Sequence, residues 1–151
     1  MAAEVNVSEV TPETIGHAVS LLERFFSEEG FGTPPPLIAA NLAAMVNDGS
    51  CWSGLADTGG VFVGVVTVTT MLYVEWGRLG EIGDLYVVPV HRRRGVARAL
   101  SHAALDWCRA RGCSAASVVI TPDGELRHNL AKFYGGLGFE RTGRTIMSRR
   151  I

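Results

Sequence analysis

At 151 residues, with 47% hydrophobic side chains, the chain has the length and apolar content of one ordinary domain with a buried core. Its 14 basic residues meet 15 acidic ones, for a net charge of -1, which argues against a nucleic-acid-binding surface. The amino terminus lacks a basic stretch followed by an apolar run, and no segment approaches the roughly 20 apolar residues of a membrane span, so we expect a soluble, cytoplasmic protein with no membrane partner.

The first part of the chain predicts one strand and two helices. Residues 4–10 read as a loose strand, and Thr11 followed by Pro12 is typical of a helix start. Apolar residues then recur at three- to four-residue spacing until Gly30, which favours a helix that ends there. The proline-rich stretch 33–36 predicts a rigid break, and residues 37–49 predict a second, shorter helix.

The middle of the chain predicts strands and then a third helix. A Thr-Gly-Gly turn joins residues 51–57 to the long, β-branched run 61–74, which is typical of an antiparallel hairpin. Residues 75–80 are expected to form a loop that leads to a strand over 81–89. A helix with one apolar face should follow from about 94 to 111.

The last part predicts a short buried strand over 116–120, a turn at 121–124 and a helix through Tyr134. Residues 139–151 are expected to form one or two closing strands. The resulting order, β α α β β β α β α β, predicts an α/β fold.

The stretch HRRRGVARAL, residues 91–100, lies between a predicted strand and a predicted helix. The free N–H groups and dipole of a helix N-terminus attract anions, and Gly95 has no Cβ to obstruct a phosphate. Neither of the two common phosphate-binding glycine motifs is present. The sequence therefore predicts an anion site of another type, although a solvated cationic helix start would look the same in isolation.

Two motifs resemble a known family. Residues 92–97, RRRGVA, fit Arg/Gln-x-x-Gly-x-Gly/Ala, and residues 133–143, FYGGLGFERTG, contain Tyr-x-x-Leu-Gly-Phe. With the preceding strand EIGDLYVVP, they resemble the GNAT superfamily of acyl-CoA-dependent N-acetyltransferases over essentially the whole chain. The resemblance implies a single domain over residues 1–151, with a mixed, mostly antiparallel central sheet that is splayed at the cofactor site and flanked by helices.

The resemblance also implies acetyl-CoA as the cosubstrate. The loop amides from Arg93 to Ala97 would hold its pyrophosphate, and the backbone of residues 86–88 would pair with its pantetheine arm. The family often has an asparagine seven residues before the motif tyrosine; this chain has Arg127 there and Asn129 two residues later. The implied cofactor-binding residues are Tyr86, Val87, Val88, Arg92, Arg93, Arg94, Gly95, Val96, Ala97 and Asn129.

Three residues are candidates for the chemistry. The resemblance places the Tyr134 hydroxyl near the thioester sulfur, and the alternative for Tyr134 is a core aromatic. An amine must lose a proton before it attacks a thioester, so a carboxylate beside the cofactor is expected. Asp84 is slightly favoured over Glu81 for its position near the cofactor arm. In a regular strand their side chains point to opposite faces, so without a bulge only one can face the acceptor. Each could instead be an ordinary edge carboxylate.

The acceptor is expected to be a primary amine of a small cationic molecule, with an aminoglycoside as the leading specific guess. Glu28, Glu29 and Glu75 are the candidate substrate-binding carboxylates. Acetylation of a protein or peptide amine and non-catalytic acyl-CoA binding remain alternatives. The odd number of cysteines without a C-x-x-C pair and the scattered histidines predict no metal. Paired C-terminal strands could make a homodimer.

Overall fold

The computed structural model describes residues 3–151, and its strands form a five-stranded sheet. The first four strands pair antiparallel in sequence order, and the fifth pairs with the fourth in parallel. The strands are β1 (Val5–Glu9), β2 (Cys51–Thr58), β3 (Val61–Tyr73), β4 (Gly77–Val87) and β5 (Ala115–Val118). This confirms the predicted α/β fold with a mixed, mostly antiparallel sheet. β4 begins within the segment that was expected to be a loop.

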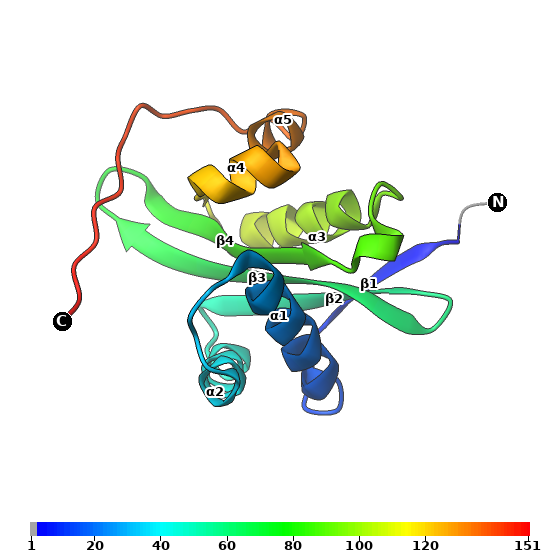
Figure 1. Cartoon of the computed structure of the whole chain (residues 1–151). Helices are drawn as coiled ribbons and strands as arrows, with labels where there is room; N and C mark the ends of the chain where they lie inside the picture. Colours follow the sequence, from blue (N-terminus) through cyan, green and yellow to red (C-terminus); the bar gives the residue numbers. More distant parts are fainter. Residues whose placement is uncertain (1–2) are drawn as a thin grey trace. The chain divides into compact units, whose positions relative to one another are not determined.

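Helices cover both faces of this sheet (Figure 1). α1 (Ile15–Glu29) and α2 (Pro35–Val46) lie on one face, and α3 (Val96–Ala110) lies on the other. Two prolines occupy the first positions of α2, where the missing N–H would have no partner in any case, so part of the expected break belongs to the helix. Among the described residues, no helix combines the length and the apolar character needed to cross a membrane.

The sheet and α3 approach each other closely. A Cβ added to Gly64 on β3 would lie 2.9 Å from Leu100 Cδ1 and 3.0 Å from the carbonyl oxygen of Tyr86. On the same face, the indole rings of Trp52 and Trp107 stack with their centroids 6.3 Å apart. The absence of a side chain at Gly64 therefore allows α3 to pack against the centre of the sheet, where Leu100 is fully buried.

β4 contains a bulge at Gly83. Thr67 on β3 pairs with Asp84, whereas the next residue, Val68, pairs with Ile82, so Gly83 has no partner on β3. A Cβ at this position would lie 3.2 Å from Thr67 Oγ1, which is tighter than most side chains tolerate. The extra residue shifts the alternation of side chains by one position, so residues before and after the bulge no longer follow a simple two-residue period.

Residues 120–151 form a separate unit that contains two short helices. α4 (Pro122–His128) begins after Thr121, whose Oγ1 accepts a hydrogen bond from the Gly124 N–H, and α5 (Leu130–Gly135) follows. The helix predicted through Tyr134 is therefore interrupted, because Asn129 adopts a left-handed conformation with φ of 50°. The prediction that residues 120–151 belong to one domain together with residues 1–119 stays a prediction.

The prediction of closing strands over residues 139–151 is wrong, since the structure has no strand there. Gly143 adopts φ of 75°, which interrupts an extended run. Ile146, Met147 and Ile151 in this segment are exposed. The homodimer was inferred from those strands and stays a prediction.

Candidate active site

The segment before α3 has a conformation suited to an anion. A short 3-10 helix, η1 (Pro89–His91), follows β4, and Arg93 and Gly95 then adopt left-handed conformations with φ of 59° and 82°. Within the described residues, the backbone N–H groups of residues 93–98 donate to no protein acceptor. Successive free amides of this kind form a concave donor site, and the dipole of α3 adds positive potential. We call residues 92–97 the anion loop.

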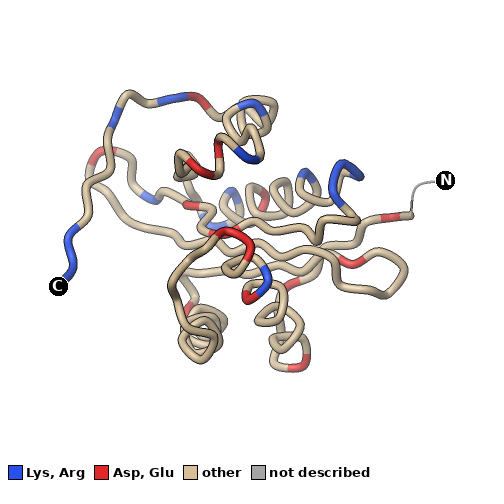
Figure 2. Tube along the Cα trace, in the orientation of Figure 1, with Lys and Arg blue, Asp and Glu red and all other residues tan. Residues whose placement is uncertain are grey.

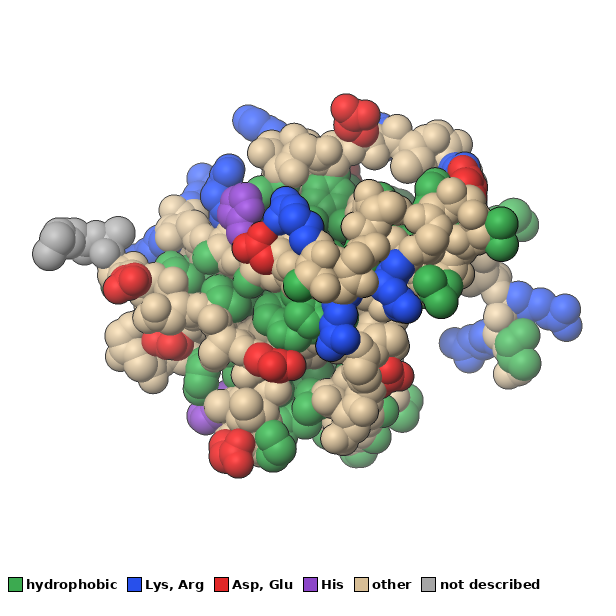
Figure 3. All heavy atoms as spheres, turned by 180° about the vertical axis from the view of Figure 1, so that it is seen from behind, with side chains coloured by type: hydrophobic (Ala, Val, Ile, Leu, Met, Phe, Trp, Pro, Cys, Tyr) green, Lys and Arg blue, Asp and Glu red, His purple; other side chains and the backbone are tan. Residues whose placement is uncertain are grey.

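The side chains of the anion loop have different environments. Arg93 and Arg94 are exposed, Val96 is buried in the core and Ala97 is half-buried. In Figure 2, the segment that precedes α3 is a concentration of basic positions, whereas the face in Figure 3 carries both signs of charge among apolar side chains. Arg93 and Arg94 therefore add exposed positive charge at the anion loop.

The side chain of Arg92 turns toward the protein. Its Nε donates to the carbonyl oxygen of Val87 at 2.8 Å, and its NH2 group lies 3.0 Å from Glu28 Oε2. The guanidinium also lies over the ring of Tyr86, 5.6 Å from its centroid. Of the three predicted arginines, Arg92 is thus engaged within the protein, while the other two extend to solvent.

The end of β4 next to the anion loop has one unpaired edge. Pairing with β5 stops at Ile82, so among the described residues the rest of β4 pairs only with β3. The Val88 N–H donates to the Val63 carbonyl on β3, and because antiparallel pairing alternates, the backbone groups of Tyr86 also face β3. The backbone groups that face away from β3 belong to Leu85 and Val87. Val87 was among the predicted residues, and Leu85 was not.

The bulge brings Glu81 and Asp84 to the same face of β4. Asp84 pairs with Thr67 and Glu81 pairs with Thr69, and these threonines are two residues apart on β3. The prediction that only one carboxylate can face the acceptor assumed a strand without a bulge, and the bulge at Gly83 removes that condition. Both side chains are half-buried.

Asp84 has the environment of a candidate base. Burial raises the pKa of its carboxyl, and the hydrogen bond from Thr67 opposes this shift only in part. The Thr67 hydroxyl donates to Asp84 Oδ2 at 2.6 Å and accepts from the Asp84 N–H at 3.0 Å. These two bonds fix the carboxylate relative to its own backbone. The geometry holds one orientation of Asp84, and its pKa is shifted toward neutrality.

A buried hydroxyl lies in the same row. Ser53 on β2 pairs with Thr67, which places Ser53, Thr67 and Asp84 side by side across three strands. Ser53 is only 3% exposed, and among the described residues its Oγ has no hydrogen-bond partner. Sequence reasoning missed this row. The signal was a serine and a threonine inside otherwise apolar strands, but their alignment depends on strand register.

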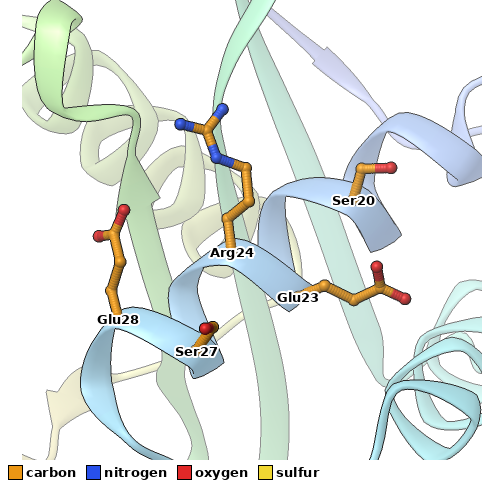
Figure 4. A pocket seen from close by; sticks show the side chains of 5 residues that line it. All are labelled: Ser20, Glu23, Arg24, Ser27 and Glu28. Carbon is orange, nitrogen blue, oxygen red and sulfur yellow. The ribbon is translucent and has the colours of Figure 1, made fainter.

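The three predicted substrate carboxylates do not form one cluster. Glu28 and Glu29 end α1, whereas Glu75 is exposed in the turn between β3 and β4, at the end of that hairpin away from the anion loop. A hollow of about 490 Å³ that is open to solvent lies along α1 instead, lined by Ser20, Glu23, Arg24, Ser27 and Glu28 (Figure 4). Glu23 is the carboxylate there that sequence reasoning missed.

Tyr134 belongs to the separate unit formed by residues 120–151. Its ring makes edge contacts with Phe133 and Phe139, and its carbonyl oxygen accepts from the Leu137 and Phe139 N–H groups. Burial raises the pKa of Tyr134 to about 12, so its hydroxyl keeps its proton at neutral pH. Asn129 separates α4 from α5 in the same unit.

Comparisons with known proteins give consistent results. The model of the family described as "Acetyltransferase (GNAT) family" matches residues 17–139. N-acetyltransferase family 8 member 2 of Rattus norvegicus is 31% identical over 101 residues, which is 66% of this chain and 42% of that protein. The match therefore spans less than half of the relative's length.

Solved structures share the fold. AAC(6')-Iy, an aminoglycoside N-acetyltransferase solved with CoA, has a TM-score of 0.84 at 21% identity, covering 99% of this chain and 97% of that chain. The same protein has also been solved with the bisubstrate analog CoA-S-monomethyl-acetylneamine. A predicted acetyltransferase with acetyl-CoA from Clostridium acetobutylicum has a TM-score of 0.78 at 16% identity, covering 97% and 96%.

Proposed function

The chain belongs to the acetyltransferase (GNAT) family, and from this premise we propose that it transfers the acetyl group of acetyl-CoA to a primary amine of a small cationic molecule. The observation that carries the proposal is the arrangement along β4. The strand ends next to the anion loop, it leaves one backbone edge unpaired, and it holds the half-buried Asp84 on the face toward α1 and α2.

The anion loop and the β4 edge fit the two parts of CoA. The free amides and exposed guanidinium groups of Arg93 and Arg94 suit a pyrophosphate. The edge at Leu85 and the Val87 N–H suits the amide groups of the pantetheine arm, which can pair as an added strand does, whereas the Val87 carbonyl already accepts from Arg92 Nε. Acetyl-CoA supplies the activated acetyl group, and the chain's own residues position it and move protons.

The proposed reaction is a direct transfer. Asp84 takes a proton from the ammonium group of the acceptor, and the freed lone pair attacks the thioester carbonyl carbon. A C–N bond forms and the C–S bond breaks as Tyr134 gives a proton to the departing thiolate. The nitrogen then loses its second proton, which restores the Tyr134 hydroxyl and leaves a neutral amide. A covalent cysteine intermediate is not proposed, because burial raises the pKa of Cys108 to about 11 and keeps the thiol protonated.

We further propose an aminoglycoside as the acceptor. Support comes from three carboxylates, Glu81 and Asp84 on the face of β4 toward α1 and α2, and Glu23 in the hollow on α1. The shared fold with AAC(6')-Iy adds an analogy but no residue assignment. Both oxygens of Glu28 already accept hydrogen bonds, and Glu75 lies at the far end of the hairpin, so these two contribute least to acceptor binding.

We expect aminoglycosides to release free CoA thiol from acetyl-CoA faster than neutral or anionic amines do. Attraction between carboxylates and ammonium groups is screened over a Debye length of about 8 Å at physiological ionic strength, so the KM for the amine should rise with added salt. A panel of aminoglycosides, polyamines, amino acids and lysine peptides, assayed by thiol release at several salt concentrations, tests this. A lysine peptide as the best acceptor, or a KM independent of salt, would contradict the proposed acceptor class while leaving the acetyl transfer intact.

We expect Tyr134→Phe to lower kcat by about a hundredfold and to leave CoA affinity unchanged, because the hydroxyl acts on the leaving sulfur and not on the phosphates. Phe133→Leu is the matched control for packing, since it disturbs the same aromatic cluster and keeps the hydroxyl. Steady-state kinetics and calorimetric titration with CoA measure the two effects. A kcat within twofold of the wild type would identify Tyr134 as a packing residue.

A further inference from the structure

Three side chains connect the C-terminal end of α1 to the anion loop. Glu28 Oε1 accepts a hydrogen bond from the Tyr86 hydroxyl at 2.7 Å, and Glu28 Oε2 pairs with Arg92 at 3.0 Å. Figure 4 shows the Glu28 carboxylate extending from α1 toward the green ribbon that follows β4. We call Glu28, Tyr86 and Arg92 the clamp.

The clamp is supported on both sides. The ring of Phe25 on α1 stacks on Tyr86 with centroids 5.5 Å apart, and Arg92 Nε donates to the Val87 carbonyl. Burial raises the pKa of Glu28. The hydrogen bonds from Tyr86 and Arg92 and the positive charges of Arg92 and Arg24 together outweigh burial, so the pKa of Glu28 is lowered. Glu28 is therefore ionised at neutral pH, and both of its oxygens are bonded.

The clamp ends where the backbone is strained. Arg92 directly precedes Arg93, whose φ of 59° is unfavourable for a residue with a side chain. Such a conformation persists only where its surroundings hold it. Arg92 is tied to β4 through Val87 and to α1 through Glu28, so it supplies an anchor at the first residue of the anion loop.

We infer that Glu28 is a positioning residue for the cofactor: through Arg92 and Tyr86, this carboxylate on α1 holds the anion loop in its binding conformation. The inference rests on the proposed function, because the ligand of the loop is taken to be CoA. It makes cofactor binding depend on the helix that also carries the hollow lined by Glu23 and Arg24.

The direction in which Glu28→Gln changes CoA affinity distinguishes this positioning role from simple electrostatic repulsion. A carboxylate near an anion site repels the ligand, so electrostatics alone predicts that Glu28→Gln tightens CoA binding. The clamp predicts the opposite, since a neutral amide holds Arg92 less firmly and the competent loop conformation becomes less populated. We expect Glu28→Gln to weaken CoA binding by about tenfold.

The matched control is another carboxylate in an ion pair. Asp106→Asn removes the partner of Arg109 on the exposed surface of α3 and should change CoA affinity by less than about twofold. Arg92→Gln should weaken CoA binding, and adding Glu28→Gln to it should cost less than Glu28→Gln costs alone, because the two variants remove the same Glu28–Arg92 contact. Tyr86→Phe removes the hydroxyl bonded to Glu28, keeps the ring on Phe25, and should weaken binding by about threefold.

A second readout needs no ligand. The anion loop presents arginines to trypsin, and cleavage there requires the loop to open, so Glu28→Gln should speed cleavage at residues 92–94 by about fivefold. Cleavage after Arg149 and Arg150 in the exposed tail provides the internal reference. CoA titration of folded Glu28→Gln that shows equal or tighter binding overturns the inference. Faster cleavage in Glu28→Gln with no CoA binding by the wild type would instead uphold the clamp and refute the proposed function.

Discussion

Gly95→Val is expected to weaken CoA binding by at least a hundredfold while the protein stays folded. A β-branched residue at φ of 82° costs about 1–3 kcal/mol, so the loop would leave this conformation. No heavy atom lies within 4 Å of a Cβ built on Gly95, which means that the core is not disturbed. The added side chain would instead stand at the N-terminus of α3, among the amides proposed to receive the pyrophosphate. Calorimetric titration with CoA measures the loss.

The control for this variant lies at the other end of the same helix. Gly112 follows α3 with φ of 76° and also has no neighbour within 4 Å of an added Cβ. Gly112→Val should therefore cost similar stability, measured by thermal unfolding, and keep full CoA affinity. Folded Gly95→Val with wild-type affinity would remove the assignment of the anion loop to the cofactor.

Asp84→Asn is expected to lower kcat by about a thousandfold at neutral pH, because an amide cannot take the proton of the acceptor ammonium. The variant keeps a side-chain oxygen that can accept from Thr67, so the fold and CoA affinity should be retained. Glu81→Gln is the informative comparison on the same face of β4. A larger loss in Glu81→Gln than in Asp84→Asn would reverse the assignment of the base.

The pH dependence follows from the direction of the Asp84 shift. Burial raises the pKa of this carboxyl, so kcat/KM should rise with pH through a value above that of an ordinary aspartate, and Asp84→Asn should lack this limb. In the same pH range the folded state binds more protons than the unfolded state. The wild type should therefore lose stability relative to Asp84→Asn as pH rises through that pKa.

The sequence predicted well what depends on local pattern. The helices α1 and α3, the β2–β3 hairpin and the strand before the anion loop follow from periodicity, glycine turns and proline stops. The loop itself was located from a glycine and its basic neighbours, and its assignment to the cofactor stays a prediction.

The sequence could not predict what depends on pairing between distant segments. The bulge at Gly83 exists because β3 aligns Thr67 with Asp84 and Val68 with Ile82, and nothing in EIGDL alone indicates it. The partners of Glu28 lie on β4 and after η1, far along the chain. The prediction of strands over residues 139–151 was wrong for a related reason, because strand formation depends on pairing with a distant segment, which the local sequence does not show.

Because of the bulge at Gly83, the number of residues in β4 decides whether Glu81 and Asp84 lie on the same face of the sheet. Loss of one residue there would restore regular alternation and turn every earlier side chain of the strand to the opposite face. Glu81 would then point toward α3, where Gly80 now packs against Cys108, and the two carboxylates would be separated by the sheet. A Cβ at position 83 would lie 3.2 Å from Thr67 Oγ1, so the arrangement depends both on the residue count of β4 and on the small size of residue 83.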